Sequence, residues 1–194
     1  MKIAVFGGSF DPPHTGHLAI ADAALKSLDI DLLIIVPAWR NPFKERFGAP
    51  PALRLRWLKK IFAHRKDVVV SDFEVRRGRP TYTIETIDYL RRRYRPKKIY
   101  LIIGEDNLAG LKRWHRYRRL AHLVEFVVAR RGGRKKLRYK SLDIDVPISS
   151  TELRTHPKRR YLPKKVAGEI IRFYRRGDRA KIPRSGTFCG RRRS

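Results

Sequence analysis

The sequence predicts an α/β protein whose core is an open, mostly parallel sheet with helices on both faces. Three observations lead to this fold class. The chain has 194 residues, of which 42% are apolar, which is enough to build the core of one domain. Its short apolar runs are continuous rather than alternating, as in strands that are covered on both faces. Segments with apolar residues at helical spacing separate these runs, in the order that a parallel sheet requires.

Six apolar runs are predicted to be strands. The first is followed by Gly7-Gly8 and the fourth by Gly104, so the backbone can turn sharply where these strands end. In chain order the predicted strands are Lys2–Phe6, Asp31–Pro37, Val68–Val70, Lys98–Ile103, Leu123–Ala129 and Leu142–Val146.

The segments between the strands are predicted to be helices. They are Thr15–Leu28, a helix opened by Pro50-Pro51, Thr83–Tyr94, a short helix from Ser150, and Pro163–Arg176, which stops at Gly177. Helical spacing places the following side chains on the inner faces: Leu18, Ala21, Leu25 and Leu28 in the first helix; Leu55, Leu58 and Phe62 in the second; Ile87, Leu90 and Tyr94 in the third; and Val166, Ile170 and Phe173 in the last.

The positive charge is concentrated in the second part of the chain. The net charge is +29, and residues 76–194 carry +26 of it, in runs such as 91–95, 112–119 and 130–140. Such a field attracts polyanions, but solvated runs on helix faces would have the same composition. We expect one domain over residues 1–177 and a basic, flexible tail over residues 178–194, where no periodicity is found.

The composition excludes several classes of protein. Cys189 is the single cysteine, so neither an intramolecular disulfide framework nor a cysteine-based zinc site can form. The apolar runs are far shorter than the roughly 18 residues that a membrane span needs. The first apolar run stops at Gly7, too early for a signal peptide. We therefore expect a soluble, cytoplasmic protein with no membrane partner.

The most informative motif lies between the first strand and the first helix. It reads Gly-Gly-Ser-Phe-Asp-Pro-Pro-His-Thr-Gly-His over residues 7–17. Glycines after a strand let the backbone approach a ligand closely, and a helix start offers free N–H groups to an anion. His14 and His17 are three residues apart, so both can face one point, and Gly16 between them keeps the approach open.

This segment resembles the signature of the H-x-G-H nucleotidyltransferase superfamily, in the form found in bacterial nicotinate-nucleotide adenylyltransferases. The segment Ile148–Arg154 resembles the second hallmark of that family, I-S-S-T-x-[IL]-R. Three weaker matches lie between them in the family's order: Asn41–Lys44, Pro80–Thr86, and Gly104–Asp106 with Trp114. The resemblance covers residues 1–176 and implies the Rossmann-like nucleotidylyl transferase fold.

The resemblance also implies a reaction. ATP and nicotinate mononucleotide would give deamido-NAD and pyrophosphate, a step of NAD biosynthesis, with Mg²⁺ carried on the phosphates of ATP and no dedicated metal site in the protein. The attacking phosphate is already ionised at neutral pH, so the enzyme needs hydrogen-bond donors and cations rather than a general base.

The residues of the site are assigned from the same resemblance. The catalytic group is expected to be His17, His14, Arg154 and Lys44. ATP is expected to contact Gly7, Gly8, Ser9, Phe10, Gly104, Asp106, Ile148, Ser149 and Ser150. The nicotinate nucleotide is expected to contact Thr81, Tyr82, Thr83 and Trp114. Two positions depart from the family pattern: Thr81 stands where serine is expected, and His115 where an aromatic residue is frequent.

Plainer interpretations of these residues stay open. Asp106 could be a helix cap, Trp114 a core residue and Lys44 a solvated lysine beside Glu45. A related enzyme acting on nicotinamide mononucleotide or phosphopantetheine would share the chemistry, and a nonspecific RNA-binding protein could share the fold. The sequence predicts no specific nucleic-acid partner and leaves a homo-oligomer open.

Overall fold

The structure is a computed structural model, which describes residues 1–40, 48–131, 138–144 and 146–175. Its centre is a six-stranded sheet in the order β3-β2-β1-β4-β5-β6, and all five neighbouring pairs are parallel. The strands are β1 (Lys2–Gly8), β2 (Leu32–Pro37), β3 (Val68–Val70), β4 (Lys98–Gly104), β5 (Glu125–Arg131) and β6 (Lys140–Ile144). The predicted α/β class and parallel sheet are confirmed.

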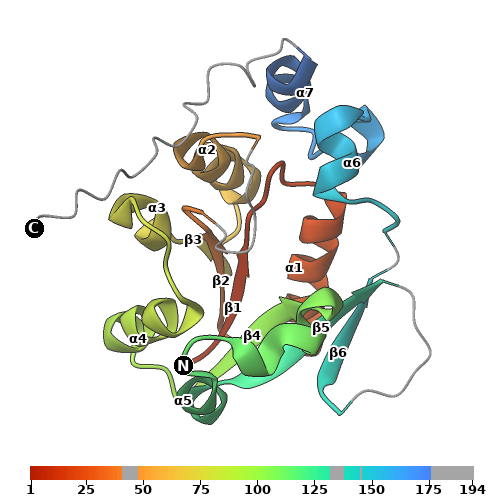
Figure 1. The fold of residues 1–194 in the computed structure, drawn as a ribbon. Coiled ribbons are helices and arrows are strands. Elements are labelled where there is room, and N and C mark those ends of the chain that lie inside the picture. The colour runs from red at the N-terminus through yellow and green to blue at the C-terminus, as the bar shows by residue number, and fades with distance from the viewer. Residues whose placement is uncertain (41–47, 132–137, 145, 176–194) are drawn as a thin grey trace, which may run out of the picture.

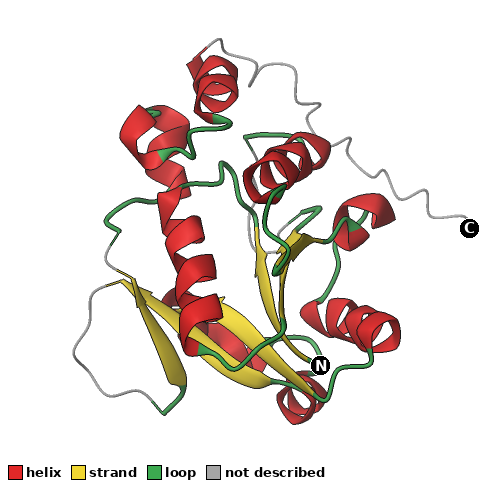
Figure 2. Cartoon of the chain, turned by 180° about the vertical axis from the view of Figure 1, so that it is seen from behind, coloured by secondary structure: helices red, strands yellow, loops and turns green. Residues whose placement is uncertain are grey.

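Helices cover both faces of this sheet (Figures 1 and 2). The α-helices are α1 (Thr15–Ser27), α2 (Pro51–Phe62), α3 (Phe73–Arg77), α4 (Thr83–Tyr94), α5 (Tyr117–Leu123), α6 (Ser150–Thr155) and α7 (Ala167–Arg175); the 3-10 helices are η1 (Glu105–Arg113) and η2 (Arg159–Tyr161). One layer of core contains side chains of α1, α2, α6 and α7, and the other contains those of α4, η1 and α5.

β1, β2 and β4 are almost wholly apolar because each sends side chains into both layers, whereas β6 buries only Leu142 and Ile144, both in the first layer. In β1, Ala4 and Phe6 enter the first layer, whereas Ile3 and Val5 enter the second. β1 lies between β2 and β4. The chain passes from β1 to β2 and β3 on one side of the sheet and then returns to β4 and continues on the other side. A ligand crevice is expected at the carboxyl end of such a strand, because the loops after β1 and β4 diverge there. In Figure 1 this end is the upper one, where α6 and α7 lie.

The structure differs from the sequence prediction in several elements. The short helices α3, η1, α5 and η2 were not predicted, and β5 begins at Glu125 because Leu123 ends α5. The last helix starts at Ala167 rather than at Pro163. No helix among the described residues is long and apolar enough to cross a bilayer. The tail expected over 178–194 lies outside the described residues.

Two inner faces were predicted only in part: Leu58, Phe62, Val166 and Ile170 are buried as expected, but other positions differ. On α2 the buried stripe includes Arg54 and Trp57, whereas Leu55 is only partly buried. On α7 the buried aromatic residue is Tyr174, and Phe173 lies at the edge of the core. Both differences have one cause. Arg54 and Tyr174 form hydrogen bonds with polar groups in the interior, and apolar periodicity alone does not place a polar side chain there.

Candidate active site

The loop between β1 and α1 is folded tightly around two aromatic side chains. Phe10 is buried at a φ of +49°, a left-handed conformation that few residues with a side chain adopt. Its ring packs edge-on against Phe6 and lies 4.8 Å from the ring of His17. A Cβ atom on Gly8 would lie 3.2 Å from the Phe10 ring, so glycine at this position lets the ring close over the strand end.

The two histidines of the loop are fixed by the start of α1. His14 precedes α1, and its Nδ1 accepts the N–H of Gly16 at 3.1 Å; the Nδ1 of His17 accepts the N–H of His14, also at 3.1 Å. The rings stack with their centroids 3.8 Å apart. Because both Nδ1 atoms accept, the hydrogen-bond pattern assigns the Nε2–H tautomer to both rings, with the donor end turned away from the helix backbone.

Gly16 is required by the same arrangement. A Cβ atom at this position would lie 3.0 Å from Nδ1 and Cε1 of His14. The hydroxyl oxygens of Ser9 and Thr15, in the same loop, are buried and have no hydrogen bond with the described part of the chain. Buried hydroxyls normally find a partner, so these two mark the loop as a place where a ligand could supply one.

The second predicted motif docks directly on this loop. The Ser149 hydroxyl caps α6 by accepting the N–H of Glu152 at 3.1 Å, and the Ser150 hydroxyl donates to the carbonyl of Pro12 at 3.1 Å. Arg154 donates from Nη1 to the carbonyl of Asp11 at 2.9 Å. Ile148 is buried in the first layer of the core. The structure therefore brings together two segments that are more than 130 residues apart in the chain.

At the end of β4 the Asp106 carboxylate lies close to Gly104. A Cβ atom on Gly104 would lie 2.3 Å from Oδ1 of Asp106, which itself accepts a hydrogen bond from the Asn107 amide at 3.0 Å. Asp106 lies in the first turn of η1 and is exposed to solvent. Its carboxylate is thus held at the end of β4, close to the backbone.

The residues predicted for the nicotinate side come from two loops that meet. Tyr82, which is 51% exposed, stacks on His115 with ring centroids 4.3 Å apart. Thr81 is buried and donates to the carbonyl of Arg79 at 3.2 Å, and Thr83 is the first residue of α4. Trp114 ends η1, half-buried against the second core layer. His115, which stands where the family pattern has an aromatic residue, therefore stacks on Tyr82 as an aromatic residue would.

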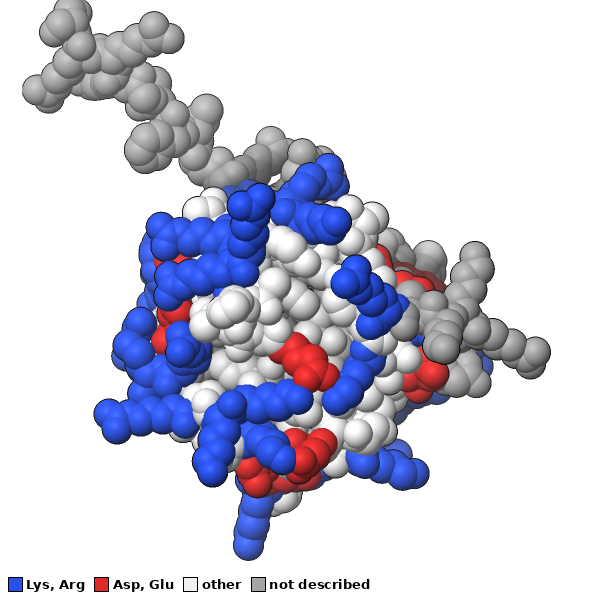
Figure 3. All heavy atoms as spheres, turned by 90° about the horizontal axis from the view of Figure 1, so that it is seen from below, with Lys and Arg blue, Asp and Glu red and all other residues white. Residues whose placement is uncertain are grey.

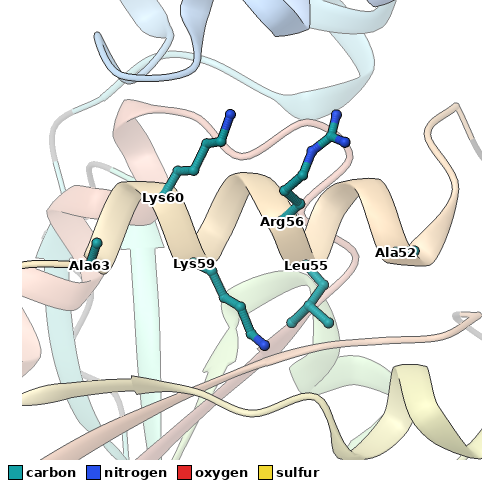
Figure 4. A pocket seen from close by; sticks show the side chains of 6 residues that line it. All are labelled: Ala52, Leu55, Arg56, Lys59, Lys60 and Ala63. Carbon is teal, nitrogen blue, oxygen red and sulfur yellow. The ribbon is translucent and has the colours of Figure 1, made fainter.

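One surface cleft among the described residues contains a predicted site residue, Trp114. This cleft, of about 600 Å³, is lined by Lys112, Trp114, Arg116, Tyr117, Arg118 and Arg119. A further cleft, of about 430 Å³, runs along the outer side of α2, where Leu55 and Lys59 point one way and Arg56 and Lys60 the other (Figure 4). The second cleft has no connection with the two motifs.

Comparison with known proteins identifies the family. The sequence model described as cytidylyltransferase-like matches residues 5–156. A protein of a Nitratiruptor species named "Probable nicotinate-nucleotide adenylyltransferase" is 62% identical over 90% of this chain and 99% of its own length. A protein of the same name from Sulfurimonas denitrificans is 51% identical over 89% of this chain and 94% of its own. The chain belongs to the nicotinate-nucleotide adenylyltransferase family. It is therefore a nucleotidyltransferase.

Solved structures have the same fold. The Plasmodium falciparum nicotinic acid mononucleotide adenylyltransferase complexed with NaAD superposes with a TM-score of 0.70, at 19% identity, over 90% of this chain and 97% of that one. The same protein complexed with APC gives a TM-score of 0.64 at 18% identity, over 90% and 96% of the two chains. At these identities the likeness establishes the nucleotidyltransferase fold, in agreement with the sequence prediction.

Sequence reasoning did not predict the role of Arg54 on α2, which contacts the loop of the first motif. Its guanidinium is fully buried, and burial lowers its pKa while the nearby Asp11 charge opposes that change. It donates to the carbonyls of Ser9, Ala38 (2.7 Å), Trp39 (3.0 Å) and Ala49 (3.0 Å). Arg54 thus joins the loops after β1 and β2. A basic residue one turn before the buried Leu58 was the available signal.

Parts of the predicted site are outside what the structure describes. Lys44 and its motif, Asn41–Lys44, fall in the segment 41–47, which is not described. Among the described residues, no group of three or more His, Cys, Asp or Glu side chains could hold a metal ion.

Proposed function

We propose that this protein transfers the adenylyl group of ATP to nicotinate mononucleotide. A phosphate oxygen of the mononucleotide attacks the α-phosphorus of ATP, the bond to the β-phosphate oxygen breaks, and deamido-NAD and pyrophosphate are formed. The observation that carries the proposal is the docking of Ile148–Arg154 on the loop 7–17, because it places two imidazole donors and a guanidinium at one strand end. The curated relatives support the same activity.

The histidines act as fixed donors to the triphosphate. Each directs an Nε2–H outward from the start of α1, where the helix N-terminus also favours an anion. These bonds cost little reorganisation when charge develops on the α-phosphoryl group, because Nδ1 of each ring is already tied to the backbone. The backbone of Gly7, Gly8, Ser9 and Phe10 lies at the same strand end and completes the ATP contacts, together with the buried Ser9 hydroxyl, which has no hydrogen bond to the described part of the chain.

Arg154 supplies the fixed positive charge. Its side chain is 22% exposed, and its Nη1 and Nη2 donate to the Asp11 carbonyl and the Thr151 hydroxyl, both at 2.9 Å. These bonds fix the charge of the guanidinium at the strand end, where it attracts phosphate oxygens. Ser149 and Ser150 hold α6 against the loop and thereby set the position of Arg154. We assign to Lys44, by the resemblance of its motif, a second charge on the phosphates.

The remaining residues bind the two nucleosides. Asp106, held against Gly104, accepts from ribose hydroxyls of ATP. The indole of Trp114 stacks on the nicotinate ring, while Thr81, Tyr82 and Thr83 supply hydroxyl and backbone donors to its carboxylate at the start of α4. Mg²⁺ enters as part of the substrate, on the phosphates of ATP, which agrees with a donor set made of imidazole, hydroxyl and guanidinium groups.

The test is pyrophosphate release with ATP and each of two acceptors, nicotinate mononucleotide and nicotinamide mononucleotide. We expect release with both but a higher kcat/KM for the acid. Equal or better use of the amide would overturn the substrate assignment and leave the adenylyl transfer intact. No release with either acceptor would overturn the proposed reaction.

A second candidate role, nonspecific binding of single-stranded nucleic acid, has one observation in its favour. The 600 Å³ cleft combines the aromatic rings of Trp114 and Tyr117 with four cationic side chains, which is the combination that binds single strands without sequence preference. The test is the affinity for a labelled oligouridylate between about 50 and 200 mM salt, over which phosphate contacts weaken steeply. A salt-independent affinity, or none at all, would exclude this role.

A further inference from the structure

We propose that Asp11 is a positioning residue of the active site, which fixes Arg154 and couples the C-terminal helix α7 to the histidine loop. The inference rests on the proposed adenylyl transfer and identifies the carboxylate that holds Arg154 in place for this reaction. Asp11 lies in the histidine loop between Phe10 and Pro12, yet no substrate contact was predicted for it.

The carboxylate of Asp11 is turned inward. The residue is 2% exposed, and its two oxygens accept hydrogen bonds from three points of the fold. The donors are the N–H of Gly48 at 2.7 Å, the N–H of Ala49 at 2.8 Å and the Tyr174 hydroxyl at 2.5 Å. A buried carboxylate with this many donors is held in a single orientation.

The orientation of the Asp11 carboxylate explains how an acidic residue can lie beside a phosphate site. A free carboxylate there would repel the triphosphate. Here the negative charge is directed to the interior, and Nη1 of Arg154 lies 3.9 Å from Oδ2. The main-chain carbonyl of the same residue accepts the Arg154 hydrogen bond at 2.9 Å. One residue thus holds the phosphate-binding guanidinium through both its backbone and its charge.

Gly48 forms the junction of these elements. A Cβ atom on Gly48 would lie 2.7 Å from the Tyr174 ring and 3.0 Å from Cδ of Arg154, so the three residues are in close contact. Gly48 therefore leaves room for Tyr174 and Arg154 to pack side by side. The N–H of Gly48 donates to the Asp11 carboxylate at 2.7 Å, so Gly48 contacts Asp11 as well as these two side chains.

The helix α7 is itself anchored on α2. Trp57 packs against Phe173 and Tyr174, with ring centroids 5.9 and 6.4 Å apart, and Lys60 pairs with Glu169 at 2.5 Å. Burial raises the pKa of Tyr174, and the Asp11 charge raises it further, so the hydroxyl keeps its proton and remains the donor. α7 therefore contributes a hydrogen bond to the active-site loop.

The experiment compares Tyr174→Phe and Asp11→Asn with the wild type, in the full chain, at a temperature where all are folded. Tyr174→Phe removes one hydrogen bond, and we expect kcat/KM for ATP to fall about 3- to 10-fold. Asp11→Asn replaces an acceptor of three bonds, and we expect a fall of about 10- to 100-fold. KM for nicotinate mononucleotide should stay within about twofold in both, because the acceptor loops are not touched.

A double-mutant cycle tests the route of the effect. If Asp11 acts through Arg154, then Asp11→Asn should lower kcat/KM for ATP by no more than about threefold in an Arg154→Ala background. Asp29→Asn and Tyr161→Phe are the matched controls: Asp29 is an exposed partner of Lys2, and Tyr161 lies under Arg160 on η2. Both should keep wild-type kinetics.

Several results would overturn the inference. The first is a wild-type kcat/KM for ATP in Tyr174→Phe and in any folded Asp11→Asn variant, even if the melting temperatures of these variants fall. The second is a full, additive loss from Asp11→Asn in the Arg154→Ala background. Should Asp11→Asn not fold, the result for Tyr174→Phe decides. A wild-type enzyme that releases no pyrophosphate with the mononucleotides would instead refute the proposed function.

Discussion

The two ends of the sheet hold their positive charges in different ways. At the carboxyl end, Arg54 and Arg154 donate to main-chain carbonyls of the strand-end loops and are largely buried. At the amino end, Lys98 and Lys140 share the carboxylate of Glu125 at 2.6 and 2.9 Å, with their side chains substantially exposed. Figure 3 views this amino end from below, where Lys and Arg side chains cover much of the rim.

The difference shows that the number of cations does not mark the site. Exposed ion pairs hold their partners loosely and are screened by salt, so they contribute to the field around the molecule but not to a defined geometry. A cation that is held by several buried acceptors points in one direction. Catalysis of phosphoryl transfer depends on direction, since donors must meet the charge where it develops.

The largest expected effect is at the carboxyl end. His17→Ala removes a donor whose ring is stacked on His14, and kcat should fall about 100- to 1,000-fold. His156→Ala, an exposed histidine just after α6, is the control and should match the wild type. Near-normal turnover by folded His17→Ala, measured as pyrophosphate release, would remove His17 from the mechanism.

Arg154→Ala tests whether a fixed cation matters more than the overall field. The net charge of the chain, +29, changes by only one unit. We nevertheless expect kcat/KM for ATP to fall about 10- to 100-fold, because a charge-assisted contact to the phosphates is lost. Removing the same unit of charge elsewhere, by Arg92→Ala on α4, provides the control. Equal losses in the two variants would mean that the field, rather than the geometry, attracts ATP.

Trp114→Ala addresses the nicotinate side, where few charges are fixed. Loss of stacking should raise KM for nicotinate mononucleotide about 10-fold and KM for ATP less than twofold. Trp114→Phe keeps an aromatic face and should recover most of the affinity. If KM for ATP changes more than KM for the mononucleotide, Trp114 belongs to the core instead.

The carboxylate of Glu74 is buried, unlike that of Glu125. Burial raises its pKa from 4.5 to about 7, although the Thr86 hydroxyl donates to it at 2.6 Å. The folded state then binds a proton more tightly than the unfolded state, so the free energy of unfolding decreases as the pH rises from about 4.5 to 7. Glu74→Gln removes this cost and should stabilise the protein by about 1–3 kcal/mol at pH 8 but not at pH 4.5. Denaturant unfolding at the two pH values measures it, and equal effects at both would contradict the assignment.

Glu125→Gln should give the smallest effect and the opposite dependence on pH. Hydrogen bonds from Lys98 and Lys140 lower the pKa of Glu125 below 4.5, so its contribution is present above that value and is lost as the pH falls through the folded-state pKa. The variant should lack this contribution at neutral pH and keep turnover within about twofold, because solvent and salt weaken exposed pairs. A large loss of turnover would contradict the conclusion that the exposed ion pairs at the amino end of the sheet do not contribute to catalysis.

Local sequence patterns predicted the fold well because the signals are local. The continuous apolar runs of β1, β2 and β4 record burial on both faces, and the Gly7–His17 pattern records a strand-to-helix turn. The contacts between loops were not predictable in this way. Tyr174 meets Asp11 across 163 positions, and Arg54 meets Ser9 across 45. A period of 3.6 residues places a polar side chain outside unless its distant partner is known.

The network around Arg54 has a consequence for movement in the molecule. One guanidinium spans the turns that follow two adjacent strands, so those turns cannot shift independently without breaking buried hydrogen bonds. We therefore expect the triphosphate side of the proposed site to be preformed. We expect any adjustment to an arriving acceptor at the exposed Tyr82–His115 stack, which can separate at little cost.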